Sequence, residues 1–176
     1  KLEFVEALRI LAKKAGVELS SSSFQTGLTA KKEKIYVLNK IALEFYHFVL
    51  TKHPAGKQAL NYLLNDRKID IRLIETFKLG FSPKSGTALS DYLINKKKYK
   101  KEDLIEASLA FDAWTGSGSR ALDFFRNRLM FPLFDHRNNV IGFSGRAIDT
   151  DYFGGKYINS RENLVYHKGS VFFGLN

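Results

Sequence analysis

The chain has 176 residues, 44% of them hydrophobic, and a formal net charge of +10 from 28 basic and 18 acidic side chains. This composition excludes a disordered segment, and the length fits one domain, or one domain with a fragment of another. The basic excess favours a polyanionic partner: nucleic acid first, an anionic membrane surface second, a merely basic soluble protein third. No apolar run approaches the roughly 20 residues of a membrane span. The absence of cysteine excludes disulfides and thiolate metal sites within these residues.

The chain opens inside a helical pattern without an initiator methionine or a signal peptide, so we expect it to be part of a longer protein. Residues 2–15 carry apolar side chains at helical spacing. The serine-rich stretch LSSSSFQTG that follows lacks periodicity, which favours a linker and a domain boundary there.

The next part of the chain is predicted to be helical. An amphipathic helix is expected over residues 32–52, ending before Pro54, and a second over 55–65. Asp70 is a candidate N-cap of a short helix. Further helices are expected from Thr87 and over residues 101–108. The lysine-rich run NKKKYKK at 95–101 is interpreted as a solvated helix end or loop in preference to a nucleic-acid contact.

Beyond GSGS at 116–119, which predicts a flexible break, the pattern changes to β. The apolar runs 129–134 and 140–148, joined by DHRNN, predict a hairpin whose second strand places Ser144 and Arg146 on one face. Weaker strands are expected at 157–158 and 171–173. The fold class is therefore α+β, a helical first half packed on a small antiparallel sheet.

Basic residues recur through this β region, with glycines beside three of them. A fixed positive charge on a strand, next to glycine, suits a phosphate that approaches the backbone closely. We therefore predict a shared phosphate-binding ridge, with an aromatic ring for stacking and an amide for base edges. Its residues are Arg126, Arg128, Arg146, Lys156, Tyr157, Asn159 and Lys168.

Patterns for catalysis are missing from the sequence. There is no P-loop, the four histidines have no metal-ligand spacing, and no carboxylate cluster follows a strand as a two-metal site requires. The expectation is a binding function, with no catalytic residue and no metal ligand within this chain.

Two motifs carry a family resemblance, FRNRLMFPLFDHRNNVIGFSGRAID and KYINSRENLVYHKGSVFFGL. They resemble the catalytic core of bacterial DNA primase (DnaG type), in the subdomain that precedes the Toprim fold. The upstream text ALNYLLNDRKIDIRLIETFKLGFSP resembles the same family and places Arg67 on its pattern arginine. Two positions depart from the pattern: Phe124 stands where the family often has arginine, and Arg161 enters where it has proline.

The resemblance implies a domain organisation. Residues 1–18 match the last helix of the primase zinc-binding domain, 19–30 a linker, and 31–176 the N-terminal subdomain of the RNA-polymerase domain. That subdomain is expected to be helical over 31–110 and β-rich over 111–176. By the same resemblance, Arg67 and the ridge residues bind template strand, nucleotide triphosphate and primer hybrid.

The resemblance further implies an enzyme that synthesises RNA primers on single-stranded DNA, cytoplasmic and at the replisome, with this segment inactive alone. Magnesium or manganese is expected in the Toprim subdomain and zinc in the zinc-binding domain, both outside this chain. The replicative helicase and single-strand-binding protein are expected to bind elsewhere, and no membrane is expected as a partner. The alternatives are the primase half of a phage-type primase–helicase and a non-catalytic single-stranded-DNA-binding module.

Overall fold

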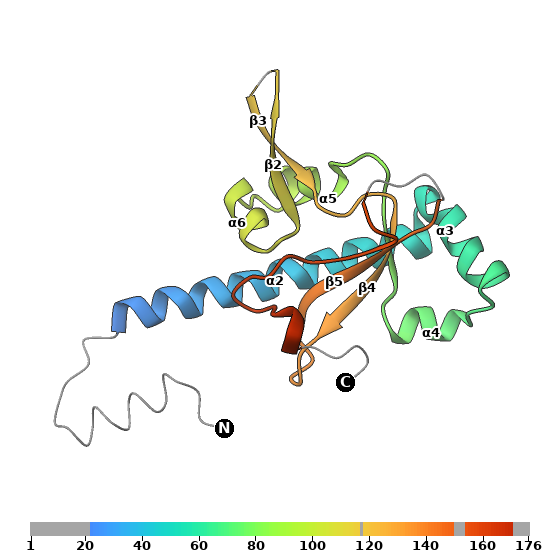
Figure 1. Ribbon diagram of the computed structural model, residues 1–176, viewed down its shortest axis with the longest axis horizontal. Helices are drawn as coiled ribbons and strands as arrows, with labels where there is room; N and C mark the ends of the chain where they lie inside the picture. Colours follow the sequence, from blue (N-terminus) through green and yellow to red (C-terminus); the bar gives the residue numbers. More distant parts are fainter. Residues whose placement is uncertain (1–21, 117, 150–153, 171–176) are drawn as a thin grey trace. The chain divides into compact units, whose positions relative to one another are not determined.

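The computed structural model describes residues 22–116, 118–149 and 154–170 (Figure 1). Contacts divide the chain after Lys31 into two units, 1–31 and 32–176, and both of the described sheets belong to the second unit. The helix predicted for 2–15 and the strand predicted for 171–173 lie outside the described residues.

Helices form most of the first half, as predicted. Asp70 does cap its helix, because its carboxylate accepts a hydrogen bond from the backbone amide of Arg72. The helical segments are α2 (Ser22–Lys52), η1 (Pro54–Gly56), α3 (Lys57–Asn61), η2 (Tyr62–Asp66), α4 (Ile71–Thr76), α5 (Ala88–Asp91), η3 (Tyr92–Lys96) and α6 (Lys101–Glu106).

Helix α2 begins at Ser22, so residues 22–30 of the predicted linker are helical. Serine costs only about 0.5 kcal/mol per residue in a helix relative to alanine, and extending an existing helix needs no new nucleus. A lack of apolar periodicity therefore did not mean a lack of helix at these positions. The domain boundaries at 18 and 31 stay a prediction.

The main sheet is antiparallel and has the strand order β1-β4-β5-β6. Strands β4 (Arg128–Phe134) and β5 (Val140–Ala147) form the predicted hairpin, and β6 (Tyr157–Asn159) pairs with β5. Strand β1 (Gly80–Ser82) was not predicted, and it lies within the segment expected to be helical. The α+β fold class is confirmed.

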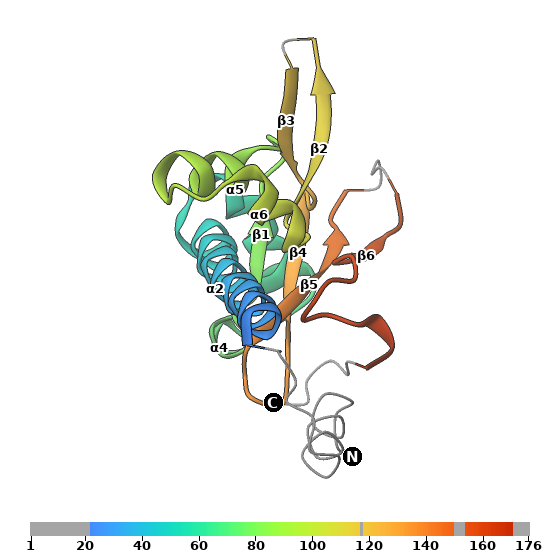
Figure 2. The ribbon, with the colours of Figure 1, turned by 90° about the vertical axis from the view of Figure 1, so that its left-hand side faces the viewer.

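A second, two-stranded sheet surrounds the predicted flexible break. Strands β2 (Ala110–Thr115) and β3 (Gly118–Asp123) pair from Ala110–Asp123 to Thr115–Gly118, so the glycines of GSGS form the tip of a hairpin. Figures 1 and 2 both show this hairpin projecting away from α5 and α6.

The part of helix α2 that follows Lys31 packs along one face of the main sheet, as the two views agree (Figures 1 and 2). Leu38 and Tyr46 of this helix join Met130 and Phe143 of the sheet in one buried cluster. The approach is close at Gly80, where an added Cβ would lie 2.5 Å from the Cβ of Tyr46. A second cluster, Val49, Leu50, Ala59, Leu63, Ile74, Leu79, Phe81 and Leu129, joins α2, α3 and α4 to strands β1 and β4.

Candidate nucleic-acid interface

The face of the sheet opposite the α2-packed face carries three of the predicted site residues. In the observed register Leu129 pairs with Arg146, which in turn pairs with Tyr157, and Ser144 pairs with Asn159. Because side chains directly opposite one another point to the same face, Arg146, Tyr157 and Asn159 share one surface. The prediction that Ser144 and Arg146 lie on one face of their strand is consistent with this register.

Arg146 makes cation–π contacts with two aromatic rings. Its guanidinium carbon lies 5.1 Å from the ring centre of Tyr62 and 6.0 Å from that of Tyr157. Contacts of this kind attract a cation to the ring face and restrict the plane of the guanidinium. The N–H groups lie at the edges of that plane, so an arginine in such contacts keeps donors for bidentate binding of a phosphate.

Beside Arg146 lies a groove with a volume of about 440 Å³. It brings together three predicted residues, Tyr157, Asn159 and Lys168, and Tyr157 is 59% exposed. An exposed ring, an amide and an ammonium group in one groove can stack on a base, bond its edge and neutralise a phosphate. The complete lining is Phe131, Leu133, Ser144, Tyr157, Asn159, Tyr166 and Lys168.

Hydrogen bonds after β6 fix the far wall of this groove. The hydroxyl of Ser160 accepts from the backbone amide of Phe143, which anchors the chain to β5. The side-chain oxygen of Asn163 then accepts from the amides of Val165 and Tyr166, at 3.0 Å each. This local turn explains why the segment NSRENLVY (residues 159–166) places the buried Tyr166 against the sheet.

Lys156 lies exposed directly before Tyr157. Its carbonyl oxygen accepts from the amide of Ala147 at 2.8 Å, which holds the backbone at this point against β5. The charge of Lys156 is therefore carried on a fixed backbone at the entry to β6, next to the exposed ring of Tyr157.

The prediction for Arg128 as a surface contact is wrong, because this residue is only 3% exposed. Its Nη1 donates to the carbonyl oxygens of Gly145 at 3.1 Å, Gly155 at 3.0 Å and Lys156 at 3.3 Å. A buried guanidinium needs such acceptors, and these three fasten the segment before β6 to β5. Arg128 is therefore a buried structural residue that fixes the backbone next to the exposed Lys156 and Tyr157.

The sequence analysis predicted that glycines beside the basic residues let a phosphate approach the backbone. At Gly145 the structure gives a different reason for glycine. An added Cβ there would lie 2.6 Å from a ring carbon of Phe125 and 3.1 Å from Cδ of Arg128. This glycine makes room for buried side chains on the face opposite Arg146, so close packing in the core explains it without an approaching phosphate.

Five predicted residues do not line the groove: Arg128, Arg146 and Lys156, described above, and Arg126 and Arg67. Arg126 is exposed, and its guanidinium carbon lies 5.4 Å from the ring centre of Phe111 in β2. Arg67 is exposed at the end of η2, the helix that begins with Tyr62. Both remain candidates for contacts with a nucleic-acid strand that extends beyond this groove.

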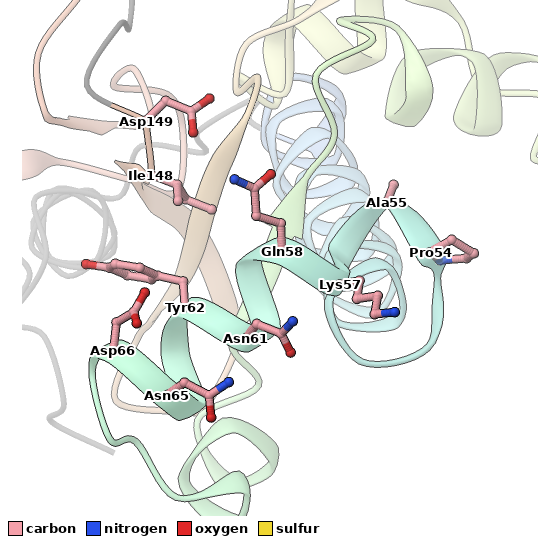
Figure 3. Close-up of a pocket in the computed structure, with 10 residues that line it drawn as sticks. All are labelled: Pro54, Ala55, Lys57, Gln58, Asn61, Tyr62, Asn65, Asp66, Ile148 and Asp149. Carbon is pink, nitrogen blue, oxygen red and sulfur yellow. The ribbon is translucent and has the colours of Figure 1, made fainter.

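Tyr62 also lines a second pocket of about 690 Å³, between α3–η2 and the residues after β5 (Figure 3). In this view Asp66 and Asp149 lie on the same side as the Tyr62 ring. Asp149 is held by the amide of Asn127 at 2.7 Å. Carboxylates repel phosphate, so a nucleic-acid backbone is expected on the groove side of Tyr62. The sequence did not indicate Tyr62, because only tertiary packing brings this helical residue to β5.

Metal ions were expected outside this chain, and the described residues do not fit one. They contain no group of three or more histidine, cysteine or carboxylate side chains that could hold a metal. No step of a reaction is therefore assigned to a metal bound by these residues. Within the same described residues, none of the helices has the length and apolar character to cross a membrane.

The fold and the groove define a basic α+β domain whose open sheet face carries cations and aromatic rings. Residues 45–176 match the family described as DNA primase catalytic core, N-terminal domain, and the chain belongs to this family. The DNA primase of Synechococcus elongatus is 32% identical over all of this chain, which spans 25% of that protein.

Solved structures of primase domains are also similar to this chain. The DnaG primase catalytic domain bound to single-stranded DNA is similar over 84% of this chain and 43% of its own, with 31% identity and a TM-score of 0.70. The zinc-binding and RNA-polymerase domains of the Aquifex aeolicus primase are similar over 99% and 39%, with 33% identity and a TM-score of 0.67.

Proposed function

We propose that this chain is the segment of a DNA primase that holds template strand, nucleotide triphosphate and primer hybrid during RNA primer synthesis. The observation that carries the proposal is the pair of cation–π contacts of Arg146 with Tyr62 and Tyr157 beside a groove lined by Asn159 and Lys168. The similarity to a primase domain bound to single-stranded DNA supports the same ligand class.

Each side chain has a defined part in this proposal. Arg146, Lys156 and Lys168 bind phosphates, Tyr157 stacks on a base, and Asn159 bonds a base edge. Phosphoryl transfer depends mostly on positioning and on neutralising charge, so such groups contribute without acting as acid or base. Arg67 and Arg126 extend the contact along the strand.

The remaining parts of the enzyme belong to the rest of the protein. We infer that magnesium or manganese is bound by a Toprim subdomain and zinc by a zinc-binding domain, and that this segment alone synthesises no primer. The replicative helicase and single-strand-binding protein then contact other regions, and the whole protein works in the cytoplasm at the replisome.

The test uses the full-length protein with Arg146→Ala and Lys156→Ala, matched with Arg72→Ala and Lys40→Ala, whose side chains are exposed on α4 and α2. Primer synthesis and affinity for single-stranded DNA are measured for each variant. Both site variants are expected to lose primer synthesis by at least about tenfold, while both controls retain it.

Wild-type activity in both site variants would exclude these residues from the function. A wild-type protein that binds single-stranded DNA but makes no primer with any metal would favour the non-catalytic binding module.

A further inference from the structure

The projecting β2–β3 hairpin carries an exposed tryptophan that the groove does not use. Trp114 is 82% exposed, more than any other large apolar side chain among the described residues. It lies near the glycine-containing tip of the hairpin, one pair before the last pair of the ladder, Thr115–Gly118. A large aromatic ring in water is unfavourable by itself, and tryptophan at such positions is typical of binding surfaces.

The side of the hairpin that carries Trp114 is defined by its hydrogen bonds. Ser119 lies directly opposite Trp114 in the register, and Asp112 lies on the same face. The ammonium group of Lys101 bonds the hydroxyl of Ser119 and lies 3.3 Å from the carboxylate of Asp112. These bonds attach the first residue of α6 to the face on which Trp114 stands.

Lys101, which is bonded to this face, also belongs to a lysine-rich run of the chain. Lys101 ends the run 95–101, which contains five lysines and no acidic residue. The charge of Lys101 is balanced by Asp112, whereas the other lysines of the run are exposed. The Nζ of Lys97 lies 5.7 Å from the ring centre of Tyr92. The run is thus a concentration of positive charge that ends at the residue bonded to the Trp114 face of the hairpin.

We propose that Trp114 and the lysines at 96, 97, 98 and 100 form a second contact for single-stranded nucleic acid. The ring stacks on a base, and the lysines follow the phosphates on either side of it. A duplex presents no free base face to such a ring. An apolar protein partner would require a wider apolar patch, whereas Asp112 and Ser119 are the neighbours of Trp114 on its face.

None of these residues lines the groove beside Arg146. The proposal therefore goes beyond the groove function and can fail without it. It reverses the sequence-based preference for the lysine run as a merely solvated helix end, because the structure bonds the end of this run to the hairpin face that carries an exposed tryptophan.

The experiment measures the affinity of the full-length protein for a labelled oligothymidylate over a series of salt concentrations. The variants are Trp114→Ala, Trp114→Phe and the triple change of Lys96, Lys97 and Lys98 to Gln. Phe48→Ala is the matched control, because Phe48 is 51% exposed on α2.

Trp114→Ala is expected to weaken binding at least about fivefold, and Trp114→Phe to recover part of that loss. The triple variant is expected to lower the slope of log affinity against log salt by up to about 2. Phe48→Ala should bind like the wild type. A normal affinity in Trp114→Ala, or an equal loss in Phe48→Ala, would overturn the proposal.

Arg146→Ala in the same assay separates the two sites. A loss in Trp114→Ala with none in Arg146→Ala supports the hairpin contact and contradicts the groove function. The reverse pattern overturns the hairpin contact alone, and would leave Trp114 to a protein partner.

Discussion

The carboxylate of Asp123, at the end of β3, accepts hydrogen bonds from both the backbone amide and the hydroxyl of Ser90 in α5. It also accepts from the amide of Leu89 at 3.0 Å. Thr87, at the N-cap position, makes no side-chain capping hydrogen bond, so a strand residue distant in sequence caps this helix instead. Asp123 is fully buried, and it connects the second sheet to the helical layer.

Asp123→Ala should therefore destabilise the fold. It leaves two backbone amides and a hydroxyl without their acceptor in a buried place, at a cost of about 3 kcal/mol. Asp123→Asn keeps one oxygen acceptor and should cost less. Urea denaturation of both variants measures the free energy of unfolding, and equal values for Ala and wild type would show that the cap contributes nothing.

The same residue predicts a dependence on pH. Burial raises the pKa of Asp123, and the hydrogen bonds from Ser90 and Leu89 lower it by less. A folded pKa above the unfolded value means that the protonated carboxyl favours the fold. This stabilisation is complete below the unfolded pKa, about 3.9, and is lost as pH rises through the higher folded pKa.

The free energy of unfolding of wild type, relative to Asp123→Asn, should accordingly fall across that window. Carboxyl titration by NMR checks the direction, and a pKa for Asp123 below that of a free aspartate would contradict it.

Local patterns account for what the sequence predicted well. Alternating apolar residues and the turn DHRNN predicted the β4–β5 hairpin and the face that carries Arg146. Strand β1 was missed because three residues give no period, and its pairing with β4 is a tertiary contact. The acceptors of Arg128 lie on segments distant from it in the sequence, which is why the pattern alone predicted a phosphate contact there and gave no sign of its burial.

The burial of Arg128 predicts that its substitution lowers the free energy of unfolding more than substitution of the neighbouring Arg126. Arg128→Gln removes the donor of three carbonyl oxygens and should lower the free energy of unfolding by about 2–4 kcal/mol. Arg126→Gln loses only a contact with Phe111 and should change it by less than about 1 kcal/mol. Thermal or urea unfolding of the two variants measures these free energies. Equal losses of stability would show that Arg128 contributes no more to the fold than Arg126.

Close packing of α2 on the sheet makes Gly80 sensitive to substitution. Gly80→Ala places a Cβ 2.5 Å from the Cβ of Tyr46 and 2.8 Å from its backbone carbon, so the helix must move. A loss of about 2–3 kcal/mol is expected. Gly27→Ala is the control, because nothing lies within 4 Å of its added Cβ and alanine favours a helix by about 0.5–1 kcal/mol. Urea denaturation measures the free energy of unfolding of both variants. Equal values would contradict the close approach of Gly80 to Tyr46.

Tyr62 is predicted to act through Arg146, as a positioning residue. Tyr62→Phe keeps the ring under the guanidinium and should bind single-stranded DNA like the wild type. Tyr62→Leu keeps apolar bulk but removes the ring, and should weaken binding about two- to fivefold. Arg146→Lys should resemble Tyr62→Leu, because an ammonium group lacks the planar fork that stacks and binds phosphate bidentately.

Salt dependence distinguishes positioning from charge. Arg146→Ala removes a phosphate contact and should lower the slope of log affinity against log salt by about 0.7, the value for one contact on a single strand. Tyr62→Leu changes no charge, so its affinity should fall at every salt concentration while the slope stays that of the wild type. A reduced slope in Tyr62→Leu would mean that Arg146 no longer reaches its phosphate, and that the ring of Tyr62 is required for the contact itself.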